Sequence, residues 1–201
     1  MARLATVREW LLRWAGVTEP DRRRREEREQ YLAVIQVRTV DPKMASFYKS
    51  TKGGKSGSQD YGAAKRNVTN LGDVARKLAR DKRLTVTLEI PDGLTMREQI
   101  LRHHDVDLFI WGHGAGMVRM LWMRPGGLGI EISASHMSKA NNHPMPPHHG
   151  GVLVAEGVGM ERRDVWVESG HAATVNVRTV SKYVDQWLQR HPHRPEEKDG
   201  K

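Results

Sequence analysis

The sequence predicts an α/β fold, a Rossmann-like parallel sheet with helices on both faces. Apolar segments of strand length alternate with amphipathic segments of helix length from residue 32 to residue 132. A glycine-rich turn, Gly112–Gly116, directly follows one apolar segment, and a proline-glycine turn at residues 125–127 precedes another. Alternation of this kind is typical of parallel strands joined by crossover helices.

The first expected helix covers residues 4–15. Four apolar residues recur there at helical spacing, with arginines opposite: Leu4, Val7, Leu11 and Trp14. A membrane-surface role for this helix is the weaker interpretation, because the apolar face is short. The basic run Arg22–Arg25 continues as a charged helix or a linker, and residues 32–37 (LAVIQV) form the first buried strand.

Two further helices carry start signals. Thr69 or Asn70 can cap a helix that runs to about residue 82. Thr95 caps the next helix, and Glu98, three residues later, completes a capping box.

The remaining elements follow from apolar patterning and turn residues. Further strands are expected at residues 84–90, 108–111, 128–132 and 152–155, with a shorter one at 166–167. Short helices are expected at residues 117–123 and 180–190, and loops at 49–63 and 136–151.

Length and composition fit one domain with polar extensions. The expected division is an amphipathic helix with a basic linker at residues 1–31, a Rossmann-like domain at 32–191 and a disordered tail at 192–201.

The absence of cysteine excludes disulfides and thiolate metal sites. No stretch approaches the roughly 18–20 apolar residues of a membrane span, and arginines interrupt the apolar residues at the N-terminus, unlike in a signal peptide. As written, the chain is therefore expected to be cytoplasmic.

The formal charge of +9 suits an anionic partner such as nucleic acid, anionic lipid or the diphosphate of a nucleotide sugar. The glycine turn favours the diphosphate. Glycines let the backbone approach a ligand closely, and the helix start behind them offers amide groups and a positive dipole end. His113, at the mouth of the turn, can donate to a phosphate oxygen. Glycine turns between a strand and a helix also serve close packing alone, and that alternative stays open.

Residues 107–132, DLFIWGHGAGMVRMLWMRPGGLGIEI, resemble the donor-domain signature of glycosyltransferase family 61. That signature consists of a hydrophobic strand, HGAG, a short helix rich in Leu and Met, a proline-glycine turn and a strand with Glu. RNVTN at residues 66–70, followed by Asp73-Val74, is similar to the family's Arg-x-Ile-x-Asn-x-x-Glu-Val pattern, with Asp for Glu. Gln99 matches a glutamine in the helix before the HGAG strand, and Arg38 ends the first donor-domain strand.

The resemblance covers about residues 7–190. It implies a GT-B architecture, in which two Rossmann-like domains face each other across a cleft, with this chain as the C-terminal, donor-binding domain. It also implies inverting transfer of a sugar from a nucleotide sugar, UDP-linked or other, to an acceptor hydroxyl of a glycan, protein or other molecule, without a metal or other cofactor. The general base would come from an acceptor-binding domain outside this chain. In a fragment of a eukaryotic family member, the compartment would be the secretory pathway or Golgi.

The resemblance also assigns roles to individual residues. Seven are expected to bind the donor: Arg38, Arg66, His113, Gly114, Ala115, Gly116 and Glu131. The arginines and the turn amides would stabilise the diphosphate as negative charge builds on it. Glu131 would accept from ribose hydroxyls, unless the alternation of its strand points it to solvent. Asn70 and Gln99 are expected to support these contacts or to cap helices rather than touch the donor.

Residues 136–151 depart from the family pattern, since they are rich in His, Asn and Pro. His143, His148 and His149 can be interpreted as metal ligands, but no carboxylate joins them at a characteristic spacing. A polar loop near the donor site is the preferred interpretation.

Two alternatives come from other functional classes. The first is a truncated or degenerate, non-catalytic module that binds nucleotides or a partner. The second is a basic nucleic-acid-binding protein, which the charge permits, although basic and aromatic residues are not interleaved on a stacking surface.

Overall fold

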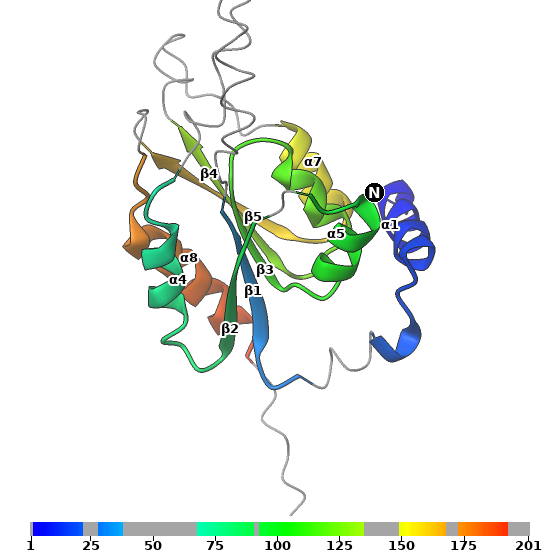
Figure 1. The fold of residues 1–201 in the computed structure, drawn as a ribbon, viewed down its shortest axis with the longest axis horizontal. Coiled ribbons are helices and arrows are strands. Elements are labelled where there is room, and N and C mark those ends of the chain that lie inside the picture. The colour runs from blue at the N-terminus through cyan, green and yellow to red at the C-terminus, as the bar shows by residue number, and fades with distance from the viewer. Residues whose placement is uncertain are drawn as a thin grey trace, which may run out of the picture.

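The computed structural model describes residues 2–21, 28–37, 68–90, 93–134, 149–167 and 173–192. Within these residues, five parallel strands form one sheet in the order β2-β1-β3-β4-β5 (Figure 1). The strands are β1 (Tyr31–Gln36), β2 (Leu84–Glu89), β3 (Leu108–Gly112), β4 (Leu128–Ala134) and β5 (Glu161–Val167). The predicted α/β class with a Rossmann-like parallel sheet is therefore confirmed.

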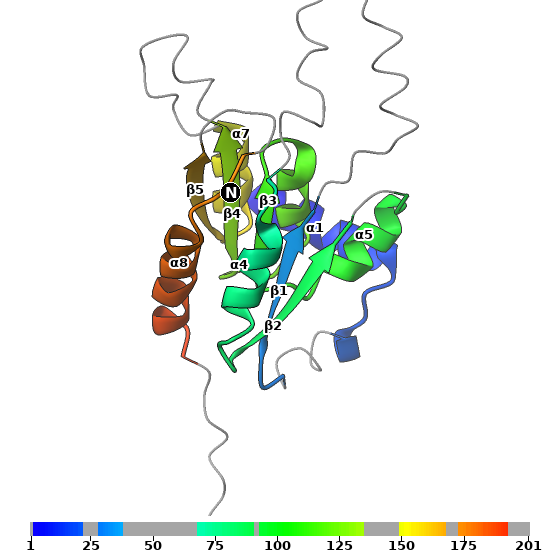
Figure 2. The ribbon, with the colours of Figure 1, turned by 60° about the vertical axis from the view of Figure 1, so that its left-hand side comes forward.

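Helices cover both faces of the sheet (Figures 1 and 2). One face carries α4 (Leu71–Leu78) and α8 (Val177–Arg190). The other carries α5 (Met96–His103), the 3-10 helix η3 (Ala115–Leu121) and α7 (His149–Gly157). The N-terminal helix α1 (Ala2–Ala15) packs against α5 and α7 on this second side.

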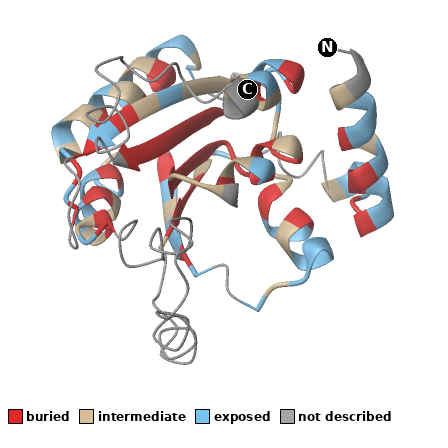
Figure 3. Cartoon of the chain, turned by 90° about the horizontal axis from the view of Figure 1, so that it is seen from above, coloured by how far each residue is buried: buried red, intermediate tan, exposed pale blue. Residues whose placement is uncertain are grey.

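Strand alternation assigns the core residues to these two layers, because successive side chains point to opposite faces. Ile35 and Ile110 pack with Trp187 of α8 on one face. Phe109 and Trp111, the neighbours of Ile110, pack with Met120 of η3 on the other. Buried residues accordingly lie along the strands and the inner sides of the helices (Figure 3).

The strand order creates a topological switch point between β1 and β3. The connection after β1 includes α4 on one face and leads to β2, whereas the connection after β3 includes η3 on the other face and leads to β4, so the two diverge at the carboxyl ends of β1 and β3. Open parallel sheets bind their ligands in such a place.

Several sequence predictions need correction. Residues 152–155 are not a strand but part of α7, because β4 and β5 are parallel and their connection runs through a helix. The short strand predicted at 166–167 is the end of the longer β5. The helix predicted at 117–123 begins at Ala115 and is a 3-10 helix. In α1, Val7 and Trp14 are exposed rather than on the buried face.

The two predicted N-terminal caps, of α5 and α4, have different outcomes. The Thr95 capping box is confirmed, since Thr95 Oγ1 accepts from the Glu98 amide at 3.3 Å and Glu98 Oε2 accepts from the Thr95 amide at 2.7 Å. Asn70 occupies the N-cap position of α4, but its side chain makes no cap hydrogen bond. Instead its amide group donates to the Val175 carbonyl at 2.8 Å and accepts from the Val175 amide at 2.9 Å, which joins α4 to the segment before α8.

Replacing Thr95 with Ala should lower the free energy of unfolding by about 1 kcal/mol, because the first turn of α5 loses its reciprocal cap. Urea denaturation measures this change. Thr95→Ser retains the hydroxyl and should stay close to wild type, and equal losses in the two variants would contradict a role for the cap.

Candidate functional site

The glycine turn predicted at Gly112–Gly116 lies at the carboxyl edge of the sheet, directly after β3. Since β3 neighbours β1 at the switch point, the turn lies where an open parallel sheet offers a ligand site. The fold therefore supports the location expected from the sequence.

Two glycines shape the turn for different reasons. Gly114 has φ 134° and ψ −152°, a conformation that residues with a side chain rarely adopt. Gly116 has a steric reason, because a Cβ atom there would lie 2.8 Å from Gln36 Oε1 and 2.8 Å from Trp111 Cδ1. Gly116 thus lets η3 lie directly on the ends of β1 and β3.

His113 begins the turn and is held from two sides. Its backbone amide donates to the Ile132 carbonyl at 2.8 Å. Its side-chain Nδ1 lies 2.5 Å from Oε1 of Glu131 on the neighbouring strand β4. An ionised carboxylate can only accept, so Nδ1 carries the proton in this pair. The orientation of the His113 ring is therefore set by Glu131.

Glu131 is itself buried and held by a second cation. Its side chain is 1% exposed, and Oε2 accepts from Arg162 of β5 at 2.6 Å. The same Nη2 of Arg162 donates to Asp164 at 2.8 Å. His113, Glu131, Arg162 and Asp164 thus form a continuous polar chain from the turn after β3 across β4 to β5, in which the two carboxylates alternate with the two basic groups.

The pKa of the Glu131 carboxyl follows from these contacts. Burial alone would raise this pKa, but the hydrogen bond from His113 and the positive charge of Arg162 outweigh burial and hold it below its ordinary value of 4.5. Glu131 is therefore ionised at neutral pH, and the solvent-facing alternative for this residue is wrong.

A second polar group joins η3 to the other half of the sheet. Arg119 of η3 is 7% exposed and donates through Nη1 to Gln36 Oε1, at the end of β1, at 2.5 Å. Its Nε and Nη2 donate to Gln99 Oε1 of α5 at 3.4 Å and 3.3 Å. Gln99 Nε2 in turn donates to the Leu94 carbonyl at 3.0 Å. Arg119 therefore ties η3 to both β1 and α5.

A further buried polar pair lies beside Gln36, at the end of the edge strand β2. Nε2 of His103 on α5 lies 3.0 Å from Glu89 Oε2 at the end of β2, and both side chains are buried. Burial would raise the pKa of Glu89, but His103 and the charge of Arg119 outweigh it, so the pKa is lowered.

One residue from each strand forms a row across the sheet: Glu89, Gln36, Trp111, Glu131 and Asp164. The register pairs Gln36 with Glu89, and Trp111 with Glu131, which pairs with Asp164. Gln36 and Trp111 each follow the register pair Ile35–Ile110, so the row crosses all five strands on the face covered by α5, η3 and α7. Trp111 is its one apolar member. The glycine turn lies directly on this row.

Comparison with known proteins identifies a family for this chain. The family model described as Glycosyltransferase 61 matches residues 26–130, just over half of the chain. The chain belongs to glycosyltransferase family 61. No curated protein matches it. The matched segment runs from the residues before β1 into β4 and includes the glycine turn. Glycosyl transfer is thus the chemistry that this family 61 domain supports.

The domain brings most of the predicted donor-binding residues together. Five lie within the turn and its contact on β4: His113, Gly114, Ala115, Gly116 and Glu131. Arg38 and Arg66 lie outside the described residues but within the segment that the family model matches. Their roles stay predictions.

The two residues expected to support the site lie apart. Gln99 accepts hydrogen bonds from Arg119 of η3, the helix that follows the glycine turn. Asn70 lies at the start of α4, on the opposite face of the sheet from η3, where it holds Val175.

Sequence reasoning missed Gln36, Arg119, Arg162 and Asp164. Gln36 directly follows the apolar residues of β1, and a polar residue at the end of an apolar run was an available signal, whereas Glu131 and Asp164 lie inside β4 and β5. Arg162 and Asp164 could not be placed in the sheet from the sequence, because the prediction for β5 covered only residues 166–167.

No group of three or more His, Cys, Asp or Glu side chains in the described part of the chain is placed to hold a metal ion. His143 and His148 lie outside it, and the side chain of His149 is not described. No helix within the described ranges is both long and apolar enough to cross a membrane.

Gly116→Ala should destabilise the domain by about 1–3 kcal/mol, because the added methyl group meets Gln36 and Trp111 at a distance that requires repacking. Gly72→Ala is the matched control. Its Cβ would meet only Arg76 Nη1 at 3.7 Å, and Ala favours the helix, so it should be neutral or stabilising. Thermal and urea unfolding measure both variants, and a neutral Gly116→Ala would contradict the close packing.

Glu131→Gln should lower the stability at pH 7 by about 3 kcal/mol, because Arg162 and His113 lose a buried charge partner. Since the folded-state pKa of Glu131 lies below 4.5, its contribution is complete above that pH and is lost progressively as the pH falls below it. The free energies of unfolding of wild type and Glu131→Gln should therefore approach each other as the pH falls below 4.5.

Urea denaturation between pH 7 and the lowest pH at which wild type stays folded measures this convergence. Glu156→Gln, which changes an exposed carboxylate of α7, should follow wild type throughout. A gap between wild type and Glu131→Gln that stays constant below pH 4.5 would contradict the assignment.

Proposed function

We propose that this domain binds the diphosphate of a nucleotide-sugar donor at the glycine turn after β3 and serves transfer of the sugar to an acceptor hydroxyl. The observation that carries the proposal is the His113–Glu131–Arg162 chain, which holds an imidazole at the carboxyl edge of the sheet beside a glycine turn. Membership of family 61 supports glycosyl transfer, and the chain of contacts supports an anion as the group bound here.

His113 is the proposed donor to the diphosphate. With Nδ1 committed to Glu131, the opposite edge of the ring presents Nε2, which donates to an anion when the ring carries both protons. Glu131 stays ionised and balances that charge, and Arg162 keeps Glu131 in place. In this proposal Glu131 acts on the donor through His113, because both of its oxygens have partners within the protein.

The glycines contribute access. Without side chains at Gly114 and Gly116, the backbone beside His113 can approach phosphate oxygens closely. Arg38, two residues beyond the end of β1, and Arg66, two residues before the Val68 bridge, are the proposed further cations for the departing nucleoside diphosphate. Stabilising that negative charge lowers the barrier for cleavage of the bond to the sugar.

The transfer is proposed to be inverting and independent of metal. The acceptor oxygen attacks the anomeric carbon while the bond to the diphosphate breaks, and a general base takes the hydroxyl proton. We propose that this base belongs to an acceptor-binding domain of a GT-B architecture. The cationic groups proposed to bind the diphosphate then replace the charge that a metal ion would supply.

The test is calorimetric titration of the chain with UDP, GDP and their common sugar conjugates. We expect wild type to bind one nucleotide in the micromolar range, and His113→Ala and Arg66→Ala each to weaken binding by about tenfold or more, as for a lost charge-assisted hydrogen bond. His104→Ala, on the far end of α5, and Arg102→Ala are the matched controls and should bind as wild type does.

Absence of binding by a folded wild-type chain would refute the donor site and favour the degenerate, non-catalytic module. Equal binding by wild type and His113→Ala would place the diphosphate away from the turn.

A further inference from the structure

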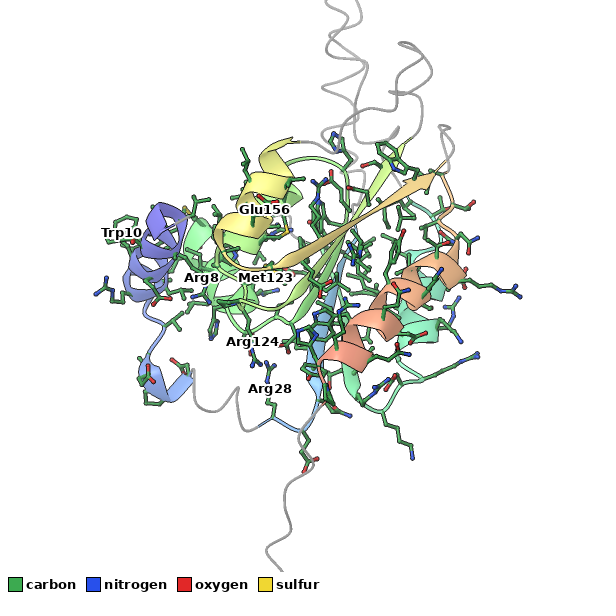
Figure 4. The ribbon with its side chains drawn as sticks, turned by 180° about the vertical axis from the view of Figure 1, so that it is seen from behind. Arg8, Trp10, Arg28, Met123, Arg124 and Glu156 are labelled. Atoms are coloured by element: carbon green, nitrogen blue, oxygen red, sulfur yellow. The ribbon has the colours of Figure 1, made fainter. Side chains whose placement is uncertain are left out.

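Trp166 presents an indole ring to solvent at the carboxyl end of the edge strand β5. Its exposed fraction is 44%, although Val165 and Val167 on either side of it are buried among the core residues under α4 and α8. Because successive side chains of a strand point to opposite faces, Trp166 lies on the face that carries α5, η3 and α7. Figure 4 shows the arrowhead of β5 extending well beyond α7, the helix marked by Glu156.

The strand register connects Trp166 to the glycine turn. Ser133 of β4 is the register partner of Trp166. The His113 amide donates to the Ile132 carbonyl at 2.8 Å, so the pairing of β3 with β4 continues one residue past Gly112 and places His113 beside Ser133. His113, Ser133 and Trp166 therefore follow one another across the sheet. Since neighbouring strands lie about 4.8 Å apart, the backbones of His113 and Trp166 are separated by about 10 Å.

The middle residue of this series, Ser133, carries a hydroxyl without a hydrogen-bond partner among the described residues. Ser133 is 3% exposed, and its Oγ atom is buried. It points to the same face as Glu131, two residues earlier, whose side chain contacts His113. A buried polar group without a hydrogen bond is unfavourable, and native structures contain few of them. A polar ligand that spans the distance from His113 to Trp166 can supply the missing bond.

A nucleoside diphosphate carries the matching groups in the matching order. With its diphosphate at His113, the nucleoside extends along the edge of the sheet toward β5. The ribose then lies at Ser133, where its hydroxyl groups can donate or accept. The base reaches Trp166, and an exposed indole ring offers a flat surface for stacking. Inorganic pyrophosphate, or a diphosphate linked only to a lipid, has neither a ribose nor a base.

We propose that Trp166 stacks on the base of the nucleotide-sugar donor and that Ser133 bonds to its ribose. This inference rests on the proposed function, because it takes the diphosphate to be bound at His113. Stacking tolerates different bases, since each has a π face. Trp166 thus selects nucleotide-linked donors as a class over other diphosphates.

Calorimetric titration with inorganic pyrophosphate, UDP and GDP tests the two parts of the site separately. Wild type should bind one nucleotide about tenfold or more tightly than pyrophosphate, as expected for one stacked base. Trp166→Ser should lose this difference and still bind pyrophosphate as wild type does. Trp10→Ser is the matched control, because Trp10 is a tryptophan with 59% exposure, and Figure 4 shows it on α1, pointing away from the body of the domain.

Two further variants give independent readouts. Trp166→Phe keeps an aromatic ring, so it should retain most of the affinity for nucleotide while losing the quenching of tryptophan fluorescence that a stacked base causes. Ser133→Ala should weaken nucleotide binding about threefold to tenfold, as for one lost hydrogen bond. It should not lower the melting temperature, because the hydroxyl that it removes has no hydrogen-bond partner in the described part of the domain.

The outcomes distinguish this inference from the proposed function. Equal nucleotide binding by wild type and Trp166→Ser would overturn the inference. So would equal affinities of wild type for nucleotide and for pyrophosphate, with both lost in His113→Ala, and the diphosphate site would then stand without a base site. Absence of all binding by folded wild type would refute the donor site and the inference with it. Thermal unfolding checks that each variant is folded.

Discussion

The contact of Gly116 with Gln36 and Trp111 sets the height of the glycine turn above the sheet. Because no Cβ intervenes, η3 rests directly on the ends of β1 and β3, and a side chain at this position would lift it. The position of His113 depends on this contact, since the residue lies three positions earlier in the same turn and must reach Glu131 at 2.5 Å. The geometry of the candidate site thus follows from packing that has no ligand in it.

The polar groups of the row beneath the turn make hydrogen bonds that fix how η3 and His113 are oriented on the sheet. Burying a charged group costs several kcal/mol unless it is paired, so each buried charge at the row constrains the elements that supply its partners. Gln36 and Gln99 accept from Arg119, which fixes η3 relative to α5, while Arg162 and Glu131 fix the ring of His113. Apolar contacts alone would permit η3 to slide, whereas these hydrogen bonds are satisfied in one arrangement.

Local signals in the sequence predicted much of this fold. The capping box at Thr95, the alternation of strands and helices and the glycine turn each depend on residues close together in the chain, and the structure contains all three. The partners in the polar row could not be found in this way, because Arg119 and Gln36 are 83 residues apart and their pairing depends on strand order. The strand predicted for VLVA at residues 152–155 was wrong for another reason. A short apolar run suits a buried helix as well as a strand, and these residues belong to α7.

The contacts that hold the glycine turn extend beyond the segment matched by the family model. The family match ends at residue 130, one residue before Glu131, yet the row that orients His113 continues to β5. Without Arg162, Glu131 would be a carboxylate at 1% exposure with His113 as its one cationic partner among the contacts described here. A buried carboxylate in that state either gains a proton or costs several kcal/mol, and in both cases it would hold the imidazole less firmly. The glycine turn therefore needs β5, and the smallest segment that can preserve the geometry of this site runs from β1 through β5.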